Sequence, residues 1–67
     1  MSNKSIGEII SSLRKEKGMT QSELADKMSV TDKAVSKWER NISCPDVNSI
    51  PKLAEILGTT VEELLNA

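Results

Sequence analysis

Apolar residues recur along the chain at spacings of three and four, the period of an amphipathic α-helix. The first such stripe consists of Ile6, Ile9, Ile10 and Leu13. Ser5 and Glu8 have the spacing of a capping box, in which each side chain satisfies a free backbone N–H at a helix start. Gly18 is a typical terminator after the last turn. The pattern predicts a first helix over residues 5–17, preceded by a flexible segment at residues 1–4.

Two shorter amphipathic stretches follow, with almost no loop between them. Thr20 and Glu23 have the spacing of a second capping box, which predicts a helix over residues 20–28. Thr31 is a good N-cap residue and predicts another helix over residues 31–40. The two helices must therefore meet at a very tight turn.

The helix predicted over residues 31–40 has two different sides. At about 100° per residue, its apolar side carries Thr31, Ala34, Val35 and Trp38. Its polar and mostly basic side carries Asp32, Lys33, Ser36, Lys37 and Arg40. The apolar side predicts that Trp38, the sole aromatic residue, lies in the core and does not stack on a base. The basic side suits either a solvated helix or one that enters the DNA major groove, where long donors meet phosphates and base acceptors.

The last third of the chain predicts two more helices. One covers residues 48–57, with Asp46 or Asn48 as its cap and Pro51 in its first turn. The other covers residues 60–66 and begins at a threonine, Thr59 or Thr60. In the loop before these helices, Ile42 is predicted to plug into the core.

These stretches predict an all-α domain over residues 5–66, a compact bundle of five short helices. A chain of 67 residues has room for one domain and depends on good caps and tight packing. Hydrophobic residues make up 37% of it, and no apolar run approaches the roughly 20 residues of a membrane span. No signal peptide is visible, so we expect a cytoplasmic protein that does not enter a membrane.

The residue types argue against an enzyme. The chain has no histidine and a single cysteine, Cys44, which excludes an internal disulfide and offers no zinc-ligand spacing. No Gly-rich phosphate loop and no obvious carboxylate pair is present. We therefore expect no catalytic residue, no metal and no cofactor, and we interpret Cys44 as a small loop residue.

The formal net charge of −1 is unusual for a protein that binds nucleic acid. Acidic residues cluster in the last third of the chain, whereas Lys33, Lys37 and Arg40 share one helix side. A small basic surface on an acidic body is compatible with DNA binding and predicts weak non-specific affinity.

Several strings resemble the helix-turn-helix family of Cro and the phage repressors. They are TQSELA at residues 20–25, VT at 30–31, AVSKWER at 34–40, PD at 45–46, LAEILG at 53–58 and EELL at 62–65. The resemblance extends over roughly residues 5 to 65. It implies a lambda-repressor-like fold that binds double-stranded DNA with the helix over residues 31–40 in the major groove.

The resemblance also implies roles for individual residues. Those expected at DNA are Gln21, Thr31, Asp32, Lys33, Ser36, Lys37, Arg40 and Asn41, and Asp32, Lys33, Ser36 and Lys37 among them are expected to face bases. Arg14 and Glu39 are expected to form a supporting ion pair, which could aim the Arg14 guanidinium at a nearby phosphate. The alternative is that these two residues are unrelated solvated charges.

Two residues depart from the family pattern. Ser29, in the tight turn, and Asn41, after the helix over residues 31–40, stand where the family often has glycine. A positive φ at Ser29 would carry strain of about 1 kcal/mol or more, whereas asparagine tolerates the left-handed region fairly well.

The function implied is that of a sequence-specific transcriptional regulator, more often a repressor, that binds an inverted repeat as a homodimer. Val61 and Leu65 are candidates for the dimer contact, with closure of the monomer core as the alternative. Two other functions stay open. One is an antitoxin-like module that binds a protein partner, and the other is a purely structural helical module.

Overall fold

The computed structural model describes residues 5–66 and is all-helical over that range. Its elements are α1 (Ile6–Glu16), α2 (Gln21–Met28), α3 (Asp32–Glu39), a 3₁₀ turn η1 (Val47–Ser49), α4 (Ile50–Leu57) and α5 (Val61–Leu65). The predicted all-α bundle of five short helices is confirmed for these residues. The flexible segment expected at residues 1–4 lies outside the described part of the chain.

The first two helices begin with complete capping boxes. The Glu8 N–H donates to Ser5 Oγ over 3.2 Å, and the Ser5 N–H donates to Glu8 Oε1 over 3.1 Å. At α2 the same reciprocal bonds join Thr20 and Glu23 over 3.1 and 2.9 Å. Both boxes agree with the sequence prediction, and each satisfies two backbone donors that the helix leaves free.

Four helices end in the same way, with a residue in the left-handed region followed by a reversal of the chain. These residues are Gly18, Ser29, Asn41 and Gly58, with φ between 58° and 71°. In each case two backbone N–H groups beyond the helix donate to carbonyls of its last turn, which is the Schellman arrangement. The positive φ considered for Ser29 is present at 58°, and Asn41 has a φ of 60°.

The start of α4 differs in detail from the expectation. Asp46 Oδ1 accepts from the Asn48 N–H over 3.2 Å, so the aspartate caps η1. The regular helix begins at Ile50, with Pro51 in its first turn, where its missing N–H removes no helical hydrogen bond. At the end of the chain Thr60 caps α5 by accepting from the Glu63 N–H over 3.1 Å.

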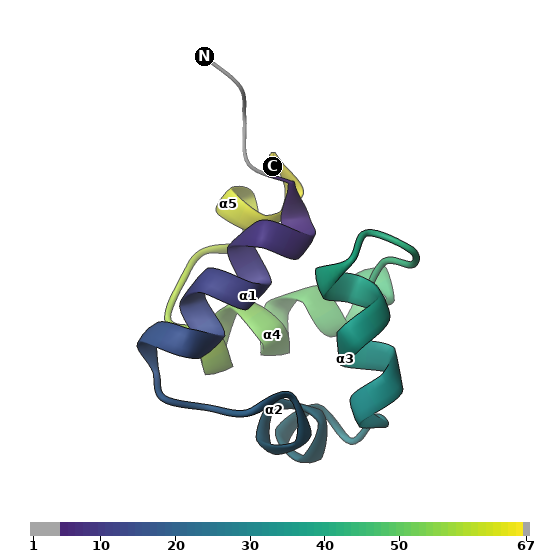
Figure 1. Cartoon of the computed structure of the whole chain (residues 1–67). Coiled ribbons are helices and arrows are strands. Elements are labelled where there is room, and N and C mark those ends of the chain that lie inside the picture. The colour runs from purple at the N-terminus through teal and green to yellow at the C-terminus, as the bar shows by residue number, and fades with distance from the viewer. Residues whose placement is uncertain (1–4, 67) are drawn as a thin grey trace.

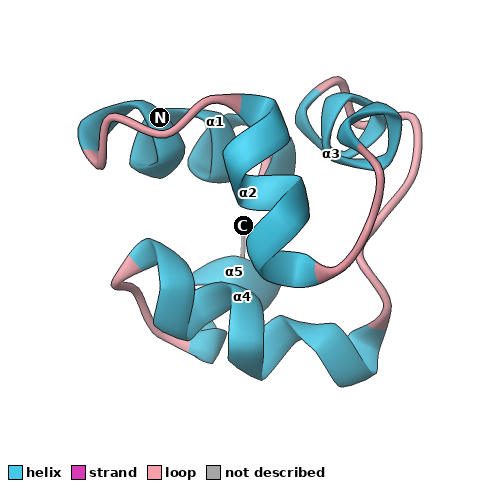
Figure 2. Ribbon diagram, turned by 90° about the horizontal axis from the view of Figure 1, so that it is seen from below, coloured by secondary structure: helices cyan, strands magenta, loops and turns pink. Residues whose placement is uncertain are grey.

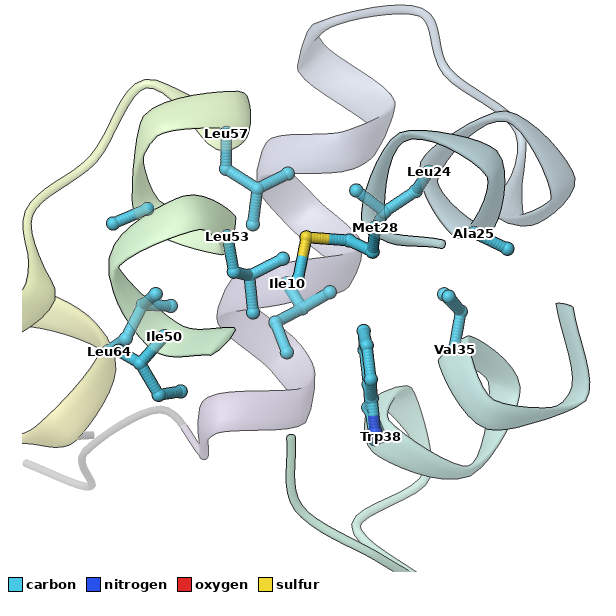
Figure 3. Packing of buried hydrophobic residues seen from close by; sticks show 11 residues of the cluster. Ile10, Leu24, Ala25, Met28, Val35, Trp38, Ile50, Leu53, Leu57 and Leu64 are labelled. Carbon is cyan, nitrogen blue, oxygen red and sulfur yellow. The ribbon is translucent and has the colours of Figure 1, made fainter. Parts of the chain in front are cut away.

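A single apolar core lies between the helices. In Figure 2, α1 and α3 lie side by side, α4 and α5 lie together across from them, and α2 spans between the two groups. Figure 3 shows how side chains from all five helices meet. The residues with almost no exposed surface are Ile10, Leu24, Val35, Leu53, Leu57 and Leu64. Because so short a chain buries little surface in total, each of these contacts contributes substantially to its stability.

The prediction that Ile42 plugs into the core is wrong. Its side chain is 61% exposed, and the buried residue of this loop is Pro45. At the equivalent place after α2, Val30 packs against the core. After α3 the chain instead runs outward along the edge of the bundle, as the teal-to-green loop in Figure 1 shows, and it returns to the core at Pro45.

Candidate nucleic-acid interface

Helix α3 is held in the core by one side. Val35 is fully buried and Trp38 is 5% exposed, and Figure 3 shows both pointing toward core side chains of α1 and α2. The predicted core role of Trp38 is therefore confirmed. At the start of the helix, the Thr31 hydroxyl oxygen accepts from the Ala34 N–H over 3.2 Å, so Thr31 is its N-cap.

The opposite side of α3 is presented to solvent. Asp32, Lys33 and Lys37 are exposed, and Ser36 is half-buried. Within residues 5–66 none of these four side chains takes part in an ion pair, so Asp32 does not restrain either lysine. Arg40 is also exposed and folds back along the helix, where its Nε donates to the Ser36 carbonyl over 3.3 Å. Three cations and one carboxylate thus project from this side.

The expected ion pair between Arg14 and Glu39 is present. Arg14 Nε donates to Glu39 Oε2 over 2.6 Å and a terminal guanidinium nitrogen donates to Oε1 over 3.0 Å, which makes the pair bidentate. The second terminal nitrogen donates to the Met19 carbonyl over 2.8 Å. The two side chains are only 10% and 7% exposed. The Arg14 guanidinium therefore faces the protein interior. The direction considered from the sequence, outward toward a phosphate, is not the one that the structure shows.

Gln21 joins the same cluster. Its Nε2 donates to Glu39 Oε1 over 3.1 Å, so one carboxylate links α1, the start of α2 and the end of α3. Burial raises the pKa of Glu39, but hydrogen bonds from Arg14 and Gln21, together with the charges of Arg14 and Lys15, outweigh it and lower the pKa below its usual 4.5. Glu39 is thus held ionised, and Gln21 is held in one orientation.

Asn41 makes contacts that the sequence did not predict. Its Oδ1 accepts from the Gly7 N–H over 3.1 Å, and its Nδ2 donates to Ser5 Oγ over 2.9 Å. Gly7 lies so close to the end of α3 that a Cβ there would be 2.5 Å from the Trp38 carbonyl oxygen. Gly7, inside the helix predicted over residues 5–17, was the available signal, because glycine is disfavoured within helices and its missing Cβ leaves room for another segment to approach closely.

A separate apolar groove of about 250 Å³ lies away from this side of α3. It is lined by Ile6, Cys44, Pro45, Val47, Ile50, Leu64 and Leu65. Leu65 is 57% exposed and Val47 is 69% exposed, so two large apolar side chains of the groove remain in contact with water.

Residues 5–66 lack two further features. No group of three or more acidic, cysteine or histidine side chains is arranged to hold a metal ion. Among the helices of this range, none combines the length and the apolar character needed to cross a membrane.

The chain is similar to known regulatory proteins. A family model described as helix-turn-helix matches residues 10–64. The chain is 40% identical over 62 residues to the HTH-type transcriptional regulator SinR of Bacillus licheniformis, which covers 91% of this chain and 56% of SinR. It is 34% identical over 59 residues to the HTH-type transcriptional activator BcrR of Enterococcus faecalis, covering 88% of this chain and 29% of BcrR. The chain thus spans about half, or less, of the length of these relatives.

Solved structures give the same picture. The P22 c2 repressor in complex with a synthetic operator superposes with a TM-score of 0.86 at 28% identity, covering 91% of this chain and 92% of the repressor chain. SinR in complex with DNA superposes with a TM-score of 0.79 at 39% identity, covering 90% of this chain and 97% of that one.

Proposed function

This chain belongs to the helix-turn-helix family, and from that premise we propose that it is a sequence-specific DNA-binding regulator of transcription. The observation that carries the proposal is that α3 has one side buried in the core and the opposite side exposed to solvent. Its inner side is fixed by Val35 and Trp38, while the outer side presents Lys33 and Lys37 with no partner among the described residues. A helix with this division fits a major groove about 12 Å wide. The proposed action is binding without catalysis, in the cytoplasm.

The outer side of α3 supplies the groups for reading bases. Lys33 and Lys37 donate to guanine O6 and N7, and Ser36 pairs with either type of base. Asp32 accepts from cytosine N4, which is the contact that offsets its repulsion by phosphate.

The DNA backbone is contacted around this side. Arg40 and Thr31, at the two ends of α3, are positioned for phosphates, and Gln21 brings the start of α2 to the same strand with its amide fixed by Glu39. Arg14 and Glu39 support this surface from behind without touching DNA.

We propose that the protein binds an inverted repeat as a homodimer. Leu65 and Val47, on the exposed rim of the apolar groove, are the contact that a second copy would cover. A two-fold dimer places its two reading helices about 34 Å apart, one turn of DNA. Repression by occlusion of a promoter is the proposed outcome, and it is supported by the repressor among the similar structures.

The test is selection of binding sites from a random duplex library at about physiological ionic strength, where non-specific attraction to phosphate is screened. The expected result is enrichment of an inverted repeat with half-sites about one helical turn apart. Lys33→Ala with Lys37→Ala is expected to abolish the enrichment.

The matched control is Lys27→Ala with Lys52→Ala, which removes the same charge from exposed positions outside α3. If no sequence is enriched, or if both double variants behave alike, α3 does not read DNA. The alternative, a module that binds a protein partner as an antitoxin does, would then take its place.

A further inference from the structure

The end of α3 is fastened to the beginning of α1 by a side chain from outside both helices. The Asn41 amide accepts from the Gly7 N–H and donates to Ser5 Oγ, over 3.1 and 2.9 Å. Both atoms it meets belong to the first turn of α1 or to its cap. The Gly7 N–H is one of the donors that a helix start leaves unsatisfied, so this contact adds to the capping of α1 from 34 residues away.

The backbones meet closely at the same point. A Cβ on Gly7 would lie 2.5 Å from the Trp38 carbonyl oxygen and 2.7 Å from that of Glu39. The last carbonyls of α3 thus face the first turn of α1, and opposite ends of two helix dipoles meet. Asn41 spans this junction, because its backbone closes α3 and its side chain binds α1.

We propose that Asn41 is a positioning residue for DNA recognition, which acts through α1 and does not touch DNA. The inference rests on the proposed function, and it reassigns a residue that the sequence had placed among the DNA contacts. Its Oδ1 and Nδ2 are both already bonded within the protein. Its φ of 60° is adopted readily by glycine and asparagine, and of these only asparagine also supplies the two bonds.

The bridge matters for binding because it fixes the direction in which α3 leaves the core. The Glu39 carboxylate holds the end of α3 farther along α1, at Arg14, and Asn41 holds it at Gly7. With both links the last turn of α3 and Arg40 are ordered before DNA arrives. With one link this segment must be ordered during binding, which weakens affinity for the correct site.

The first experiment compares Asn41→Gly with the wild type on the selected operator and on an unrelated duplex. Glycine keeps the left-handed backbone and removes only the side-chain bridge. Operator affinity is expected to fall about threefold to tenfold, the effect of one or two net hydrogen bonds. Affinity for the unrelated duplex and the salt dependence of binding are expected to stay the same.

Two results would overturn the inference. Equal losses on both duplexes, with the salt dependence reduced by about one phosphate contact, would mean that Asn41 touches the backbone directly. Unchanged affinity for both duplexes would mean that the bridge has no role in binding. A wild type that does not discriminate at all refutes the proposed function itself, and this result is separate from the other two.

The second experiment tests the route through α1. Ser5→Ala removes the hydroxyl that accepts from Asn41, and Ser5→Thr is the matched control because threonine keeps both the hydroxyl and the cap. We expect Ser5→Ala to weaken operator binding and Ser5→Thr to preserve it. The loss in Ser5→Ala combined with Asn41→Gly should be smaller than the product of the single losses. Independent, multiplicative losses would contradict the bridge.

Discussion

Two residues with nearly the same backbone conformation stand on either side of α3, and they are used differently. Ser29 precedes the helix with a φ of 58°, and Asn41 follows it with a φ of 60°. Each closes a helix by the same pair of backbone hydrogen bonds. The Ser29 side chain makes no hydrogen bond among the described residues, whereas the Asn41 side chain makes two.

The residues directly after Ser29 and Asn41 also differ, in how far they are buried. Val30, after Ser29, packs against the core, whereas Ile42, after Asn41, is exposed. The entrance to α3 is therefore fixed by apolar packing, and its exit is fixed by polar links from Glu39 and Asn41 to α1. Both ends of α3 are therefore fixed, and beyond Trp38 the fixing contacts at the exit are polar.

Glu39→Ala breaks the exit most severely and has the largest expected effect. It leaves the Arg14 guanidinium buried without its carboxylate, which costs about 3–5 kcal/mol in the free energy of unfolding. Urea denaturation followed by circular dichroism measures the loss. Glu55→Ala, which removes an exposed carboxylate, is expected to change stability by less than about 0.5 kcal/mol. Equal losses for the two variants would show that the exit does not depend on the ion pair.

Lys37→Ala leaves both junctions intact and alters only the outer side of α3. We expect discrimination at one base position to fall by about 1–3 kcal/mol, measured by competition with duplexes substituted at each position. Lys52→Ala is the control that removes the same charge from α4. A uniform loss over all duplexes would place Lys37 at a phosphate instead of a base.

Low pH is expected to weaken the ion pair between Glu39 and Arg14 at the end of α3 without any mutation. Because the pKa of Glu39 is lower in the folded chain than its usual 4.5, its contribution to stability is present above that pH and is lost as the pH falls through the folded value. The difference in urea midpoint between the wild type and Glu39→Gln is therefore expected to narrow from pH 7 toward pH 3. A difference that stays constant over this range would mean that Glu39 does not titrate as an ion-pair partner.

Ser29→Gly removes backbone strain in the turn before α3 and has the smallest expected effect on stability. Glycine removes the strain of a left-handed serine, which should stabilise the fold by about 0.5–1 kcal/mol and raise the melting temperature by a few degrees. Asn41→Gly is expected to show no such gain, because it also loses two hydrogen bonds. A gain at Asn41 as large as that at Ser29 would remove the distinction between the two junctions.

The fold could be predicted from the sequence where the signal is local. The capping boxes at Ser5 and Thr20 involve residues three apart, and the side of α3 that carries Val35 and Trp38 follows from helical spacing. Such patterns depend on the chain only within a turn or two.

The unpredicted features depend on contacts between distant segments. The bond between Asn41 and Gly7 joins residues 34 apart, and no local pattern encodes it. The exposure of Ile42 depends on the path of a loop, which an apolar residue type does not determine. The Arg14 and Glu39 pair was expected only through family resemblance, and the inward direction of its guanidinium required the structure.

The burial of Trp38 also gives the molecule a built-in optical probe. It is the only aromatic residue of the chain, so all indole fluorescence originates from one position on α3. Because that indole is 5% exposed and sits among aliphatic side chains, its emission is expected at short wavelength and should shift to the red when α3 leaves the core. A fluorescence emission spectrum therefore reports whether α3 is packed against the core, without a label and without a signal from any other residue.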